Sequence, residues 1–88
     1  MKLIPGKLYR VVFSQMWFVD DVPFEQRKEY SAEKGAIIMF IEYLSGTEGL
    51  RGLKYGEPVF LVNGYRVFNN TNYIDRRLER YLEEVKNF

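Results

Sequence analysis

The stretch VFLVNGYRVF, residues 59–68, decides the fold because it predicts two β-strands joined by a two-residue turn. The runs on either side of Asn-Gly are rich in β-branched and aromatic residues, which favour strands. A type I′ turn requires positive φ at both turn positions, and Asn followed by Gly tolerates this best. This turn sets the register, so Val62 is predicted to face Tyr65. Two residues further from the turn, Phe60 is predicted to face Val67.

Two more strands are predicted before this hairpin. The segment KLYRVVF, residues 7–13, alternates between two sides, with Tyr9, Val11 and Phe13 on the apolar one. The segment AIIMFIEYLS, residues 36–45, is the most apolar run of the chain and is predicted to be the central strand, covered on both sides. Residues 14–31 between them are predicted to form a long, partly extended hairpin loop, because Pro23 would interrupt a central strand.

A C-terminal amphipathic helix is predicted over about residues 73–87, because the apolar period changes from 2 to 3.6 after Asn72. The apolar stripe would consist of Ile74, Leu78, Tyr81, Leu82, Val85 and Phe88. This stripe must be buried, either against the strands or against a second chain. Both a monomer and a homodimer formed through the helix are therefore open.

The composition indicates a single folded domain of 88 residues, 47% apolar and 17% aromatic. The sequence contains no cysteine and no histidine, so neither a disulfide nor a Cys/His metal site can stabilise it. Thirteen Lys and Arg against twelve Asp and Glu leave a net charge of +1, which is no global signature of a nucleic-acid-binding protein. Because no disulfide and no Cys/His metal site is available, the apolar core must suffice to hold the fold.

Catalysis is not expected. Without histidine or cysteine, the serines and threonines have no imidazole to activate them. The acids Asp20, Asp21 and Glu25 do not reproduce the spacing of a calcium loop. We therefore predict no enzyme activity, no cofactor and no metal.

The N-terminal segment and the apolar runs predict neither a signal peptide nor a membrane span. Residues 1–13 contain a proline, a glycine and several charges where a signal peptide needs an unbroken apolar stretch. No run approaches the roughly 18 apolar residues that span a bilayer. A cytoplasmic protein that does not associate with membranes is the expectation.

Three stretches resemble the Src-homology-3 family. KLYRV at residues 7–11 lies where that family has Ala-Leu-Tyr-Asp-Tyr, and YSAEKGAIIMFIE at 30–42 is similar to its diverging turn and the strand after it. GYRVFNNTNYI at 64–74 resembles its closing Phe-Pro-Ser-Asn-Tyr-Val segment. The resemblance implies a mainly β fold, a small five-stranded barrel over about residues 7–74, with the predicted helix after it.

The resemblance also implies a row of aromatic side chains that binds proline-rich peptides. Tyr9, Asn72 and Tyr73 match family positions in that row. The chain departs from the pattern at Val11 and Asn70, and it has no tryptophan near the strand that supplies the indole of the groove. Recognition of polyproline therefore does not follow from the resemblance.

The stretches LIPGKLYRV and KGAIIMFIEY are also similar to small uncharacterised proteins of bacteriophages. This likeness implies a role in infection, exerted in the host cytoplasm on a partner from the host or the virion.

A protein-contact surface is predicted where aromatics meet acids in the long hairpin. Exposed aromatics would anchor a partner and the acids would favour a basic one. The predicted contact residues are Trp17, Phe18, Asp20, Asp21 and Phe24 of the hairpin, together with Tyr9, Asn72 and Tyr73. The alternative for each aromatic is a place in the core.

Nucleic-acid binding is the second hypothesis. Small barrels of this type bind RNA and DNA, with basic residues on the phosphates and aromatics available for stacking. The basic residues that would carry it lie in the connector, the hairpin and the helix, namely Arg51, Lys54, Arg66, Arg76, Arg77 and Arg80. Since acids neighbour the helical arginines, weak surface ion pairs are the plainer account.

Overall fold

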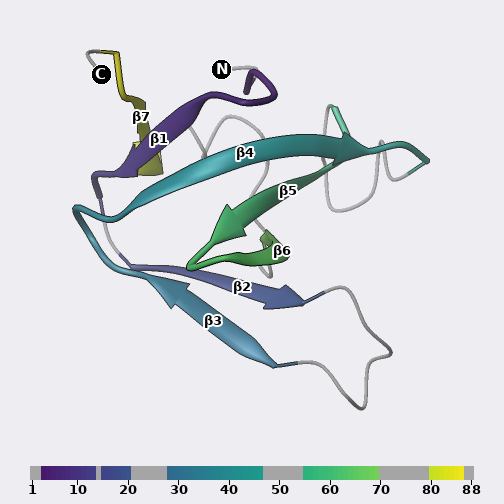
Figure 1. The fold of residues 1–88 in the computed structure, drawn as a ribbon, viewed down its shortest axis with the longest axis horizontal. Coiled ribbons are helices and arrows are strands. Elements are labelled where there is room, and N and C mark those ends of the chain that lie inside the picture. Colours follow the sequence, from purple (N-terminus) through teal and green to yellow (C-terminus); the bar gives the residue numbers. More distant parts are fainter. Residues whose placement is uncertain (1–2, 14, 21–27, 47–54, 70–79, 87–88) are drawn as a thin grey trace.

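The computed structural model of the protein describes residues 3–13, 15–20, 28–46, 55–69 and 80–86. Within these residues, seven antiparallel strands form one sheet (Figure 1). They are β1 (Leu8–Val11), β2 (Met16–Asp20), β3 (Glu29–Ala32), β4 (Ile37–Leu44), β5 (Glu57–Val62), β6 (Tyr65–Asn69) and β7 (Leu82–Glu84). The mainly β class predicted from the sequence is confirmed.

The strands follow the order β3-β2-β6-β5-β4-β1-β7 across the sheet. The first strand of the chain therefore lies beside the last one, and β5 occupies the middle. The sheet curves so that β1 and β4 lie across from β2 and β3, with β5 and β6 between them (Figure 1). In the described part of the chain β3 and β7 do not pair with each other, so the sheet is not closed.

The β5–β6 hairpin forms as predicted. Val62 pairs with Tyr65, and Phe60 pairs with Val67. Asn63 has a φ of 52° and Gly64 a φ of 84°, the left-handed values that the turn requires. This local signal survives in the fold because turn chemistry and strand pattern agree.

The main core lies on the inner side of the curved sheet, where every second residue of a strand points. Phe60 is fully buried at its centre. Its ring meets the rings of Phe18 and Phe40 edge-on, each at a centroid distance of 5.6 Å. Such edge-to-face pairs add to the gain from burial. Three strands, β2, β4 and β5, are thus joined by one aromatic cluster.

A second, smaller cluster lies on the other face of the sheet. Val19, Val59 and Phe68 are buried there, from β2, β5 and β6, with Ile41 and Leu44 packed against them. The register brings the three together, because Phe68 pairs with both Val59 and Val19. The middle of the sheet is therefore apolar on both faces.

The prediction that residues 36–45 form the central strand, covered on both sides, is only partly right. They do form an inner strand, β4, between β1 and β5. Its first outward residue, Ile37, is 46% exposed, while Ile38 is buried. A continuous apolar run did not distinguish a strand covered on both faces from one covered mainly on its inner face.

The predicted C-terminal helix is wrong at residues 82–84. Arg80 and Tyr81 have helical backbone, but Leu82–Glu84 is strand β7, paired antiparallel with β1. Residues 73–79 and 87 of that prediction lie outside the described residues. An inward Leu82 followed by an outward Glu83 is compatible with a strand as well as with a helix. Pairing with the edge of β1 favours the strand.

The predicted loop over residues 14–31 contains two strands instead. β2 and β3 pair antiparallel, with Phe18 opposite Tyr30. Met16 and Phe18 are fully buried, so this segment belongs to the core rather than to a partly buried loop. Pro23 lies outside the described residues.

Neighbouring residues of β5 should differ sharply in their effect on stability. Phe60→Ala should lower the free energy of unfolding by about 3–5 kcal/mol, because it removes the ring at the centre of the core. Leu61→Ala should cost about 1 kcal/mol or less, because Leu61 points outward and is 37% exposed. Urea denaturation measures both, and equal losses would contradict this account of the core.

The hairpin turn should be sensitive to a methyl group at one position. Gly64→Ala should cost roughly 1–2 kcal/mol, because Ala at a positive φ is strained. No heavy atom lies within 4 Å of the position that a Cβ would take at Gly64, so the loss would arise from the backbone alone. Asn63→Gly should be close to neutral in the same urea titration, since Gly also adopts positive φ. A neutral Gly64→Ala would contradict the type I′ turn.

Candidate functional site

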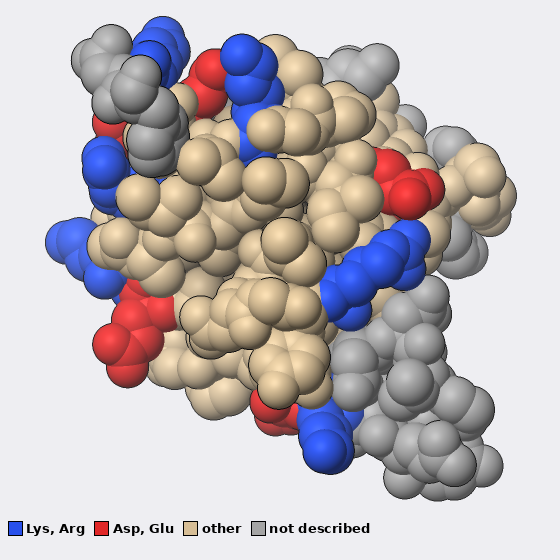
Figure 2. Space-filling model, viewed as in Figure 1, with Lys and Arg blue, Asp and Glu red and all other residues tan. Residues whose placement is uncertain are grey.

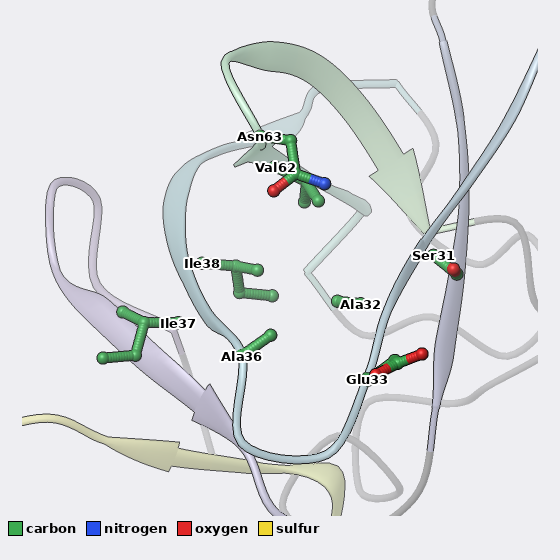
Figure 3. A pocket seen from close by; sticks show the side chains of 8 residues that line it. All are labelled: Ser31, Ala32, Glu33, Ala36, Ile37, Ile38, Val62 and Asn63. Atoms are coloured by element: carbon green, nitrogen blue, oxygen red, sulfur yellow. The ribbon is translucent and has the colours of Figure 1, made fainter.

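A pocket of about 300 Å³ lies between β3 and β4, where the two strands diverge from the turn that joins them (Figure 3). The tip of the β5–β6 hairpin closes its third side (Figure 3). We call it the turn pocket. Its lining residues are Ser31, Ala32, Glu33, Ala36, Ile37, Ile38, Val62 and Asn63.

The turn at residues 33–36 forms a fixed wall of the turn pocket. The backbone N–H of Ala36 donates to the carbonyl of Glu33 at 2.9 Å. The N–H of Gly35 donates to the carbonyl of Val11 at 2.7 Å, and the N–H of Val11 donates to the carbonyl of Ala36 at 2.9 Å. Because these bonds tie the turn to β1, the pocket does not depend on a free loop.

The turn pocket has an apolar floor. The side chains of Ala32, Ala36, Ile38 and Val62 point into the space between the strands, and Ile37 points away from it (Figure 3). Three of the four floor residues, all except Ala36, are buried. A concave apolar surface of this kind accepts an aliphatic group.

Polar groups lie around this floor. Ser31 and Glu33 lie on the β3 side, and Asn63 lies at the hairpin tip (Figure 3). The carboxylate of Glu33 points away from the middle of the pocket (Figure 3), and Glu33 is exposed. The charge at this site therefore lies along the rim, outside the apolar floor.

An aromatic pair flanks the pocket. The rings of Tyr30 in β3 and Tyr65 in β6 stack at a centroid distance of 5.0 Å and an interplanar angle of 28°. Tyr65 follows the pocket residue Asn63 by two positions and is 54% exposed. Large, half-exposed aromatic surface beside a concave apolar site is typical of protein contact surfaces.

Trp17 lies on the outer face of the β2–β3 pair. It is 45% exposed and stands directly opposite Ser31 in the β2–β3 register. Directly opposed residues project from the same face of a sheet, with their Cβ atoms about 5 Å apart. The structure therefore leaves one predicted contact residue, Trp17, exposed on the outer face of the β2–β3 pair, whereas the neighbouring Ala32 points into the turn pocket on the inner face.

Two other predicted contact residues belong to the core. Tyr9 is 1% exposed, and its hydroxyl accepts a hydrogen bond from the N–H of Ile4 at 2.9 Å. Phe18 is fully buried against Phe60. In this fold neither side chain is available to a partner, because strand alternation turns Phe18 inward and its neighbour Trp17 outward.

The remaining predicted contact residues are not placed by the structure. Asp20 ends β2, but the placement of its side chain is not described. Asp21, Phe24, Asn72 and Tyr73 lie outside the described residues. The acidic part of the predicted hairpin surface stays a prediction.

Of the six residues predicted for nucleic-acid binding, the structure describes Arg66 and Arg80. Arg66 forms an ion pair with Glu42 at 3.3 Å, and both side chains are about half exposed. Arg80 is exposed. The other four, Arg51, Lys54, Arg76 and Arg77, lie outside the described residues. The two described arginines therefore do not establish a basic surface.

One face of the molecule shows how the described charges are distributed. Figure 2 shows basic and acidic side chains interspersed around the margin of this face, with a broad uncharged centre. A phosphate-binding surface requires basic side chains gathered together. On this face the basic side chains are not gathered together.

Among the described residues there is neither a metal-binding cluster nor a membrane-spanning helix. No group of three or more acidic, histidine or cysteine residues is arranged there to hold a metal ion. The described residues contain no helix with the length and apolarity needed to cross a bilayer.

No protein-family model matches the chain, and neither a curated protein nor a solved structure is significantly similar to it. Function must therefore be inferred from the chemistry of the site itself.

Sequence reasoning did not identify the turn pocket or the stacked pair beside it. Tyr30 and Tyr65 are 35 positions apart, and only the curvature of the sheet brings their rings together. The sequence signal that was present is AEKGA at residues 32–36, whose small residues leave room between two diverging strands. By itself this segment predicts only a turn.

The Tyr30–Tyr65 stack should show energetic coupling. In a double-mutant cycle with Tyr30→Ala and Tyr65→Ala, the coupling free energy should be about 0.5–1.5 kcal/mol, because each substitution alone already removes the stack. A control cycle with Tyr30→Ala and Leu61→Ala should show about 0.5 kcal/mol or less, since Leu61 points away from the core. Urea denaturation of each variant supplies the values, and equal coupling in the two cycles would count against the stack.

Proposed function

We propose that this chain is a small barrel of the Src-homology-3 type and that it acts as a non-enzymatic protein-binding module. Five consecutive strands of the sheet, β7-β1-β4-β5-β6, support the barrel. Pairing of β7 with β1 places the last described strand beside the first, and the sheet curves as in an open barrel (Figure 1). The hairpin β2–β3 extends this unit beyond β6.

The observation that carries the binding function is the exposure of Trp17 on the outer face of the β2–β3 pair. Burying an indole fully is favourable, and this one is 45% exposed although the fold buries Phe18 next to it completely. Its neighbour across the strand pair, Ser31, lines the turn pocket. An exposed tryptophan is a typical energetic centre of a protein interface.

The surface is suited to contact with a protein chain because its parts have complementary roles. The apolar floor accepts an aliphatic side chain. Tyr65 offers rigid aromatic area beside the pocket, and Trp17 offers it on the outer face of the β2–β3 pair, each at small entropic cost. Ser31 and Asn63 provide hydrogen-bonding groups at the rim, which orient a partner.

Nucleic-acid binding is the alternative, and it has less support. The guanidinium of Arg66 is engaged by Glu42, which reduces its attraction for a phosphate.

The likeness of LIPGKLYRV and KGAIIMFIEY to bacteriophage proteins suggests the host cytoplasm as the place of action, with a partner from the host or the virion.

Capture from a nuclease-treated host lysate tests the proposal. Immobilised wild-type protein should retain a protein partner, and Trp17→Ala should reduce the retained amount about tenfold or more, because tryptophan is the expected hot spot. Leu61→Ala should retain the partner fully, since it removes an exposed apolar side chain elsewhere on the sheet. Near-native stability of both variants in urea denaturation controls for loss of the fold.

Salt and nuclease separate the two functions. A protein partner held by apolar contacts should remain bound between about 0.1 and 0.5 M salt, whereas binding through several phosphates weakens steeply over such a range. Retention that disappears with nuclease, or that depends on Arg66 and Arg80 but not on Trp17, would replace the proposal by nucleic-acid binding.

A further inference from the structure

We propose that the outer edge of β3, together with the turn pocket, binds an extended basic segment of a partner protein as an added strand. This inference rests on the proposed function and states how the partner is recognised. In such strand addition, main-chain hydrogen bonds supply affinity, and alternate side chains supply specificity. The partner would continue the sheet beyond β3, the last strand on that side.

The backbone direction of β2 is known from one hydrogen bond. The side-chain amide of Asn69 in β6 donates to the carbonyl of Trp17 at 3.3 Å, so this carbonyl faces β6. Backbone groups of successive residues in a strand point to opposite neighbours. Met16 and Phe18 therefore direct their backbone groups to the other neighbour, β3.

The same alternation determines which backbone groups of β3 face outward. Met16 pairs with Ala32, and Phe18 pairs with Tyr30, so Ala32 and Tyr30 exchange hydrogen bonds with β2. The N–H and C=O groups of the odd residues, Glu29 and Ser31, then point away from β2. No strand in the described ranges pairs with β3 on that side. Ser31 is half-buried and Glu29 is exposed, so an added strand has access to both.

The charges along this edge specify a basic partner. Glu29 and Ser31 project from one face of β3, and Glu33 follows directly after the strand. Both glutamates are exposed. Directly opposite residues on an added strand lie within about 5.5 Å at Cβ, where opposite charges stabilise the pairing. Lys28 directly precedes Glu29, so by strand alternation its side chain projects from the other face. Lysine or arginine opposite Glu29 and Glu33 is therefore favoured.

A second copy of this chain is a poor occupant of the same edge. In an antiparallel pair of two β3 strands centred on Ser31, Glu29 of each copy would stand opposite Glu33 of the other. Like charges directly opposite each other destabilise strand pairing. The edge therefore discriminates against self-association and favours a segment with basic residues four positions apart.

The turn pocket adds an apolar requirement between the two basic positions. An added residue opposite Ala32 projects from the inner face, where Ile38 and Val62 form the floor. An aliphatic side chain there would gain burial on a surface that is already shaped. The favoured segment thus alternates basic, aliphatic, small polar, aliphatic and basic residues.

A five-residue probe tests this pattern directly. The peptide Ac-Lys-Leu-Thr-Val-Lys-NH2, added antiparallel, places its lysines opposite Glu33 and Glu29 and its leucine opposite Ala32. In a titration followed by amide NMR, it should shift the signals of residues 29–33, 36–38 and 62–63. The variant Ac-Glu-Leu-Thr-Val-Glu-NH2 should bind at least about tenfold more weakly, because its charges repel the edge.

Backbone methylation separates strand addition from simple attraction of charge. The threonine N–H of the probe would donate to the carbonyl of Ser31, so N-methylation at threonine should weaken binding about fivefold or more. The valine N–H would point away from β3, so N-methylation at valine is the matched control and should have little effect. Equal weakening by the two methyl groups would overturn the added strand.

Charge reversal on the protein tests the specificity. The double variant Glu29→Lys, Glu33→Lys should reverse the preference and bind the acidic probe more tightly than the basic one. Glu83→Lys, on the exposed side of β7, should leave the preference unchanged and serves as the control. Equal affinity of wild-type protein for the two probes, shifts centred elsewhere, or no binding of the basic probe would each overturn the proposal. If Trp17→Ala still captured less partner than the wild type, the protein-binding module would stand without strand addition. If Trp17→Ala captured as much partner as the wild type, the proposed protein-binding module would itself be contradicted.

Discussion

The fold depends on the burial of Phe60 between the rings of Phe18 and Phe40. Phe40 pairs directly with Phe60 across β4 and β5, whereas Phe18 lies two strands away from Phe60 in the sheet, so the sheet must curve to bring its ring into contact. The chain has no cysteine, so no covalent link holds the curved sheet together. In a domain of 88 residues, where burial of apolar surface is limited by size, this aromatic cluster is the main source of cohesion.

The same curvature creates the site. Because the sheet wraps around one core without closing, β3 diverges from β4 after the turn at residues 33–36. The small side chains Ala32 and Ala36 do not fill the space between the two strands, and the turn pocket results. Hydrogen bonds from the turn to β1 make this opening a defined feature of the fold. The proposed binding surface is thus a consequence of how the core is built.

The candidate site was only partly predictable from the sequence. The composition identified the aromatic and acidic segment around Trp17, but it did not show that Trp17 and Phe18 point to opposite faces of a strand. Tyr9 matched a family position on the surface, yet its hydroxyl is satisfied inside by the N–H of Ile4. The Tyr30–Tyr65 stack joins residues that no local pattern connects. Contacts between distant segments follow from register and curvature, which a linear pattern does not contain.

The sequence by itself determined the mainly β class, the Asn63-Gly64 hairpin with its register, and the alternation that buries Tyr9 and Val11. These features are local, since they depend on turn chemistry and on the period of apolar residues. Only the tertiary structure decided that Leu82–Glu84 is a strand and that β3 ends the sheet at an open edge. Both outcomes depend on which strand edge is left to pair once the core has formed, because a short apolar segment takes the conformation that its neighbours require.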